Sequence, residues 1–113
     1  MTRSLGKEGE QMAERYLEKL GYRVLSRNER LVGCEIDLIM KDGEETVFVE
    51  VKTRRSHSMG YPEESVTPRK RGHIRRAAEA WLLAHGERPW RVDVVAITWA
   101  EGAKPEIAHF IGI

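Results

Sequence analysis

The sequence predicts an α/β protein in which a central mixed β-sheet packs against helices on its faces. Three observations point to this class. Two short apolar runs on either side of Asp42-Gly43 have the pattern of a β-hairpin, with strands near 35–40 and 46–52. Two segments, 4–20 and 67–86, repeat apolar residues at helical spacing. Further strand-like residues follow the second segment, so helices and strands alternate as they do in α/β folds.

The first helix is expected over residues 4–20, with Ser4 as its N-cap and Gly21 at its end. Its apolar stripe consists of Leu5, Gly9, Met12, Ala13, Tyr16, Leu17 and Leu20. At about 100° per residue, Glu10 lies at the edge of this stripe. Glu10 could therefore reach into a site beside the core, and an ordinary exposed glutamate fits the position equally well.

Two less regular segments flank the hairpin. Residues 22–28 alternate loosely and are expected to form a strand, followed by a polar connection over 29–33. After the hairpin, 53–65 is expected to form a loop over the site, because it contains Gly and Pro and no helical stripe. His57 lies in this loop.

The second helix is expected to start with Thr67 as N-cap and Pro68 at its first position, and to end near Gly86. Its inner face would carry Ile74, Ala77, Ala78, Trp81, Leu82 and His85. Two strands are expected after it, at 91–98 and, with a weaker pattern, at 106–111.

The hairpin combines an apolar face with a charged one, because side chains alternate across a strand. Pairing Met40 with Val47 places Asp37 directly opposite Glu50, with Lys52 on the same face. The other face would carry Ile36, Leu38, Met40, Val47, Val49 and Val51.

Two carboxylates side by side in a sheet work against stability. At about 4–5 Å they repel by roughly 3–4 kcal/mol at an effective dielectric near 20. A divalent cation such as Mg²⁺ would reverse the sign of this interaction, because hard cations take carboxylate oxygens. Asp37, Glu50 and Lys52 are therefore candidate active-site residues. The alternative is a solvated hairpin face with an incidental pair between Glu50 and Lys52.

The charges are distributed unevenly although the net charge is only +1. Residues 52–76 hold 8 basic and 2 acidic side chains, whereas the segments before and after carry nets of −3 and −2. Within this block the second helix begins with Arg69, Lys70, Arg71, Arg75 and Arg76. Cations oppose the helix dipole at an N-terminus, but dipole and cations act together on a phosphate. The block suits nucleic acid, and a solvated helix face is the alternative.

Length and composition favour one globular domain over residues 1–113, with 41% apolar and 33% charged residues. No apolar run approaches the length of a membrane span and no signal-peptide pattern opens the chain. The single cysteine, Cys34, cannot form an internal disulfide and is expected to pack. Together these features favour a cytoplasmic protein without a membrane partner, and leave open whether two copies form a homodimer.

Asp37, separated by twelve residues from Glu50-Val51-Lys52, resembles the D-x(n)-E-x-K core of the PD-(D/E)XK nuclease superfamily. A wider pattern resembles the YraN family of small bacterial proteins labelled as endonucleases, and that superfamily includes the similar archaeal Holliday-junction resolvases. The pattern comprises Gly9-Glu10, Ala13, Tyr16-Leu17, Gly21-Tyr22, Asn28, 35–39, 47–54, Gly60, Lys70 and 91–93. Ile36 stands where a proline often precedes the first acid.

The resemblance implies a restriction-endonuclease-like three-layer sandwich and a metal-dependent nuclease. Asp37, Glu50 and the Val51 carbonyl would bind Mg²⁺ or Mn²⁺, and Lys52 would act on the attacking water. Glu10 would complete the catalytic group, and Glu35 would hold an outer water. The expected nucleic acid is DNA, which could include structured DNA. Its phosphate backbone would be held by Arg54, Arg55, Lys70, Arg71 and Arg75. The alternative is a nucleic-acid-binding module of the same fold with weak or no turnover, and a third is a structural domain whose basic helix binds a protein.

Overall fold

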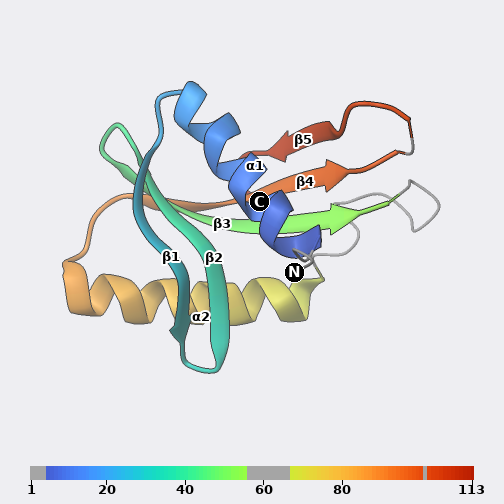
Figure 1. The fold of residues 1–113 in the computed structure, drawn as a ribbon. Coiled ribbons are helices and arrows are strands. Elements are labelled where there is room, and N and C mark those ends of the chain that lie inside the picture. The colour runs from blue at the N-terminus through green and yellow to red at the C-terminus, as the bar shows by residue number, and fades with distance from the viewer. Residues whose placement is uncertain (1–4, 56–66, 101) are drawn as a thin grey trace.

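The computed structural model describes residues 5–55, 67–100 and 102–113 and contains two helices and one sheet (Figure 1). The elements are α1 (Leu5–Lys19), β1 (Arg23–Leu31), β2 (Cys34–Asp42), β3 (Glu45–Arg54), α2 (Pro68–His85), β4 (Trp90–Thr98) and β5 (Glu106–Phe110). The predicted order of helix, strand, hairpin, helix, strand and strand is confirmed.

The five strands form one sheet in the order β1-β2-β3-β4-β5. Neighbouring strands are antiparallel except for β3 and β4, which run parallel because α2 carries the chain back between them. The sheet is therefore mixed, as predicted. The predicted pairing of Met40 with Val47 is confirmed, but the ladder ends at Leu38 and Val49, so Asp37 and Glu50 do not form the strand pair that this register implied.

One helix covers each face of the sheet, which makes three layers (Figure 1). Where α1 packs on the sheet, the two share a buried cluster of Ala13, Leu17, Tyr22, Leu38, Met40, Val47, Val49, Val95 and Ile97. Where α2 packs on the opposite face, helix and sheet share a second buried cluster of Ile36, Ile39, Phe48, Ile74, Ala77, Ala78, Trp81 and Leu82. Because β2, β3 and β4 lie between the two clusters, they are apolar on both faces.

The prediction for Ile36 is wrong. Strand alternation placed it with Leu38 and Met40, but its side chain is buried in the α2 cluster. The last β2–β3 pair is Leu38 with Val49, and beyond it β2 pairs only with β1. The β1–β2 ribbon turns there and crosses α2, so the alternation of a flat sheet no longer holds (Figure 1).

Several predicted boundaries differ from the structure. Residues 29–31 continue β1 instead of forming a polar connection, and a two-residue turn at Val32 and Gly33 joins β1 to β2. β3 continues to Arg54 instead of ending at Lys52. The expected Ser4 N-cap and residues 56–65 of the expected loop, His57 included, lie outside the described residues. No described helix has both the length and the apolar character needed to cross a membrane.

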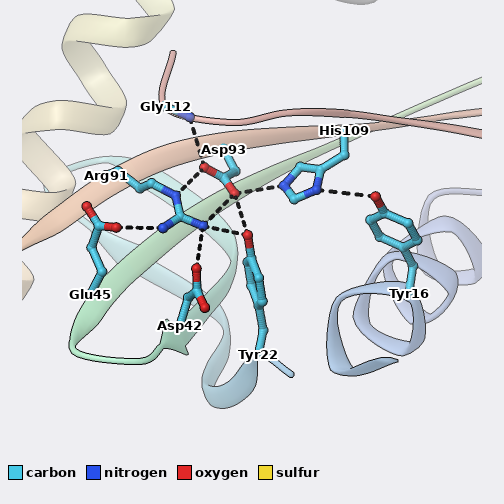
Figure 2. A network of polar contacts seen from close by, with 8 residues as sticks. All are labelled: Tyr16, Tyr22, Asp42, Glu45, Arg91, Asp93, His109 and Gly112. Atoms are coloured by element: carbon cyan, nitrogen blue, oxygen red, sulfur yellow. Dashed lines mark hydrogen bonds and ion pairs between the residues drawn. The ribbon is translucent and has the colours of Figure 1, made fainter. Parts of the chain in front are cut away.

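A buried polar network holds the end of the sheet where β4 begins (Figure 2). Asp93 has a fully buried side chain and accepts hydrogen bonds from Arg91 Nε at 2.9 Å and from the Gly112 N–H at 3.1 Å. His109 Nε2 lies 2.7 Å from the same carboxylate. Burial and the Asp93 charge raise the pKa of Tyr22, which also contacts Arg91.

Arg91 joins this network to the hairpin. Its guanidinium also pairs with Glu45 at 2.6 Å and with Asp42 at 3.1 Å. Burial acts to lower the pKa of Arg91, but the bonds to Asp93 and Glu45 outweigh it and raise the pKa. Arg91, which is always charged, therefore connects the β2–β3 turn to β4, and Asp93 connects β4 to the C-terminal residues.

Replacing Asp93 with asparagine should cost about 3 kcal/mol of unfolding free energy, because a neutral amide cannot replace the fully buried carboxylate that accepts bonds from Arg91 and from the Gly112 N–H. The matched control is Glu45→Gln, whose carboxylate is 37% exposed and should contribute less than about 1 kcal/mol. Urea denaturation of the two variants measures the difference. Equal losses would show that the buried carboxylate contributes no more than a surface pair.

Candidate active site

Asp37 and Glu50 lie where β2 separates from β3. The Glu50 side chain is only 9% exposed, and Asp37 is half-buried beside it. Asp37 Oδ2 accepts a hydrogen bond of 2.8 Å from the backbone N–H of Val51. The side chain of Asp37 thus binds the backbone of β3 just past the last paired residues of the hairpin.

This placement disfavours the ionised form of Asp37. Burial and the nearby Glu50 charge raise the pKa of Asp37 from 3.8 to about 8, although the Val51 hydrogen bond acts in the opposite direction. A carboxylate pair with this electrostatic cost is a candidate for function rather than for fold stability.

Two lysines share the Glu50 carboxylate. Lys70 Nζ lies 2.5 Å from Glu50 Oε2, and Lys52 Nζ lies 3.6 Å from the same oxygen. Burial and the neighbouring Lys70 lower the pKa of Lys52. For Lys70, burial acts to lower the pKa, but the bond to Glu50 prevails and raises it. Sequence reasoning assigned Lys70 to the nucleic-acid backbone, whereas the structure shows it bound to Glu50.

Local sequence explains how Lys70 reaches this position. Thr67 caps α2 as predicted, since its Oγ1 accepts a hydrogen bond of 3.2 Å from the Lys70 N–H, and Pro68 occupies the first turn. The cap fixes where α2 begins, and that start places Lys70 beside the sheet.

α1 brings Glu10 to the same site through a close approach to β3. A Cβ atom at Gly9 would lie 2.4 Å from Thr53 Cγ2, so only glycine fits there without a shift. Glu10 Oε1 accepts a hydrogen bond of 2.9 Å from Asn28 Nδ2. Glu10, Asn28 and Asp37 line one pocket of about 280 Å³.

Asn28 is a site residue that sequence reasoning included in a family pattern but gave no role. Its φ of 49° lies in the left-handed region, which asparagine tolerates better than most residues. Its neighbours Arg27 and Glu29 pair with Leu38 and Ile36, which places Asn28 across from Asp37. An asparagine in a strand pattern was the available signal for this role.

The arginines expected at the backbone lie in different places. Arg55, Arg71 and Arg75 are exposed, and Arg75 stacks over the Trp90 ring at 5.4 Å. Arg54 is half-buried and its Nε lies 3.4 Å from Thr98 Oγ1. Glu35 pairs with Arg30 at 3.5 Å on the exposed part of the hairpin.

The oxygen donors at this site suit a divalent cation. Asp37 and Glu50 are adjacent carboxylates, and the Val51 carbonyl belongs to the backbone segment that Asp37 binds. Among the described residues, no three acidic, histidine or cysteine side chains converge as a complete ligand group. Such a cation would therefore need water or substrate oxygens as well, which is the usual coordination of Mg²⁺.

The protein has a mixed sheet between two helices, with Asp37, Glu50 and Lys52 where β2 and β3 separate. This arrangement is that of the restriction-endonuclease-like class of α/β proteins. The chain belongs to the uncharacterised protein family UPF0102, whose model matches residues 9–97. This is the YraN family that the sequence pattern resembled.

Relatives from several bacteria match nearly the whole chain. A UPF0102 protein of Geobacter sulfurreducens is 47% identical over 107 residues, which cover 93% of this chain and 84% of the relative. One from Anaeromyxobacter dehalogenans is 46% identical over 95% of this chain and 81% of its own length. One from Leifsonia xyli is 43% identical, with 96% and 94% covered.

The raised pKa of Asp37 predicts a pH-dependent stability in EDTA. The folded protein keeps this proton up to about pH 8, whereas the unfolded chain loses it near 3.8. The folded state thus binds more protons across this window, so the contribution of Asp37 to stability falls as pH rises. Asp37→Asn should gain up to about 5 kcal/mol over the wild type at pH 8, because asparagine avoids both the cost of burying a charge and the repulsion from Glu50, and little near pH 4.

Urea denaturation at pH 5 and pH 8 measures this difference. The matched control is Glu35→Gln, an exposed acid on the same strand, which should give the same difference from the wild type at both pH values. A gain for Asp37→Asn that does not grow with pH would contradict the electrostatic account.

Proposed function

We propose that this protein hydrolyses phosphodiester bonds of nucleic acid with the help of Mg²⁺ or Mn²⁺, and that DNA is its main substrate. The observation that carries the proposal is the adjacency of the half-buried Asp37 and the buried Glu50. Fold stability does not require this arrangement, and a divalent cation would turn its repulsion into attraction. The family membership is consistent with this role.

The residues would divide the work as follows. Asp37, Glu50 and the Val51 carbonyl would hold the cation, which lowers the pKa of a bound water and stabilises charge on the phosphate. Lys52, with its lowered pKa, would orient the attacking water and offset charge on the pentavalent phosphorus. Glu10 would hold a further water across the pocket, where Asn28 fixes its carboxylate.

Lys70 has a distinct role in this proposal. In the absence of a cation it neutralises Glu50 at 2.5 Å. With a cation held at Glu50, the ammonium of Lys70 would be available for a phosphate oxygen of the substrate. Lys70 would thus serve both the site and the nucleic-acid backbone, and Arg54 and Arg55 would extend that contact along the strand.

A binding module without turnover is the second candidate. The short bond between Lys70 and Glu50 favours it, because the ammonium already satisfies the carboxylate that a cation needs. Titration with Mg²⁺ and Mn²⁺ separates the two functions, since only the nuclease requires a cation site.

Asp37→Asn, Glu50→Gln and Lys52→Ala should each reduce cleavage of a mixed DNA panel to background, because each removes a cation ligand or the group that acts on water. Circular dichroism should show that all three variants fold. Glu44→Gln, an exposed acid in the hairpin turn, is the control that keeps activity. Cleavage that persists in EDTA, or in all three variants, would refute the mechanism.

Lys70→Met should bind Mn²⁺ roughly tenfold more tightly than the wild type, or ~1.4 kcal/mol, because the cation no longer competes with an ammonium for Glu50. Its cleavage rate should nevertheless fall. Isothermal titration calorimetry of the free protein gives the affinity, with Lys19→Met on the exposed end of α1 as the control. Unchanged or weaker Mn²⁺ binding would show that Lys70 and the cation do not share Glu50.

A further inference from the structure

The turn between β1 and β2 has an unusual residue at its tip. Leu31 pairs with Cys34, so Val32 and Gly33 form a two-residue hairpin loop, and their φ angles are 49° and 75°. Two positive φ angles are typical of a type I′ turn, in which Asn-Gly is preferred. A β-branched residue is strained in this region, and the Val32 side chain is also 70% exposed. The chain therefore presents an apolar side chain to solvent at a position that favours asparagine.

The tip lies against α2, where the ribbon crosses the helix (Figure 1). Two adjoining grooves, with volumes of about 290 Å³ and 240 Å³, lie between the tip and the helix. The first is lined by Gly33, Cys34, Thr67, Arg69, Lys70 and His73, and the second by Val32, Gly33, His73 and Arg76. None of these described lining residues is acidic.

The grooves lie along only one flank of α2, the helix that begins with the basic residues. Arg69, His73 and Arg76 follow one another at spacings of four and three residues, so they form a row along α2. Arg71 and Arg75 lie on the other flank, where Arg75 covers Trp90. Lys70 lines the first groove and binds Glu50, so the grooves border the candidate active site at Lys70.

We propose that these two grooves bind one strand of nucleic acid, with phosphates on Arg69, His73 and Arg76 and an unpaired base against Val32. This inference rests on the proposed function and specifies its substrate class. A row of two arginines and a histidine, whose side chains donate hydrogen bonds, suits a phosphate backbone. An apolar side chain contacts the face of a base without the cost of unstacking only where that face is already exposed, as in single strands and at branch points. The preferred substrate is therefore DNA in which a single strand leaves a duplex.

The role of Val32 is tested with Val32→Asn, which suits the turn better than valine does. The variant should melt at a higher temperature than the wild type and yet bind a forked duplex with single-stranded arms at least about fivefold more weakly, a loss of ~1 kcal/mol. Its affinity for a continuous duplex of the same sequence should change little. Fluorescence anisotropy in EDTA measures both affinities without cleavage. Unchanged affinity for the fork would overturn the contact with a base.

The row on α2 is tested with two matched double variants. Arg69→Glu with Arg76→Glu, and Arg71→Glu with Arg75→Glu, change the charge of the same helix equally. The first should weaken fork binding more and flatten its dependence on salt, by about 0.7 in log–log slope for each lost contact with a single strand. Circular dichroism confirms that both variants fold.

The outcomes distinguish this inference from the proposed function. Equal losses in the two double variants, or a larger loss for Arg71 and Arg75, would overturn the groove assignment while leaving a nuclease intact. A wild type that binds neither the fork nor the duplex, and cleaves neither with Mg²⁺ or Mn²⁺, would refute the proposed function and this inference together.

Discussion

The site depends on one electrostatic constraint, the proximity of the Asp37 and Glu50 carboxylates in a half-buried position. A sheet that continued in regular pairing would leave Asp37 on an ordinary hairpin face. Instead, β2 pairs with β3 only from Leu38 onward, and the Asp37 side chain just before it accepts a hydrogen bond from the β3 backbone. The repulsion is offset by ammonium groups from β3 and from the capped start of α2. The separation of the strands lets Asp37 bind the β3 backbone, and the position of α2 lets an ammonium group neutralise Glu50.

Stability must come from elsewhere, because this arrangement contributes little to it. Two apolar clusters hold the helices on the sheet, and the network around Arg91 and Asp93 holds the end where β4 begins. The two non-glycine residues with positive φ, among those that the structure describes, are Asn28 and Val32, and both lie on the β1–β2 ribbon. Backbone strain therefore lies on the ribbon that borders the site and the grooves, whereas the fully buried charge lies in a satisfied network.

Much of the fold was accessible to sequence reasoning because it depends on local periodicity and caps. The pairing of Met40 with Val47 follows from alternation, and the start of α2 follows from Thr67 and Pro68. The side on which Ile36 packs could not be predicted in this way, because alternation does not report where a strand leaves its partner. The continuation of β1 to Leu31 was missed for a related reason, since valine in a left-handed turn position gives no turn signal.

The sequence by itself determined the order of elements, the mixed α/β class and the pairing of Met40 with Val47 in the hairpin that carries Asp37, Glu50 and Lys52. These features depend on residue spacing, which the chain carries directly. Only the tertiary structure decided that Lys70 binds Glu50, that Glu10 and Asn28 share a pocket with Asp37, and which flank of α2 lies against the turn at Val32. Those contacts join residues far apart in the chain, and they depend on how the β1–β2 ribbon bends and how closely Gly9 lets α1 approach β3. Distances of this kind are set by packing, which periodicity does not encode.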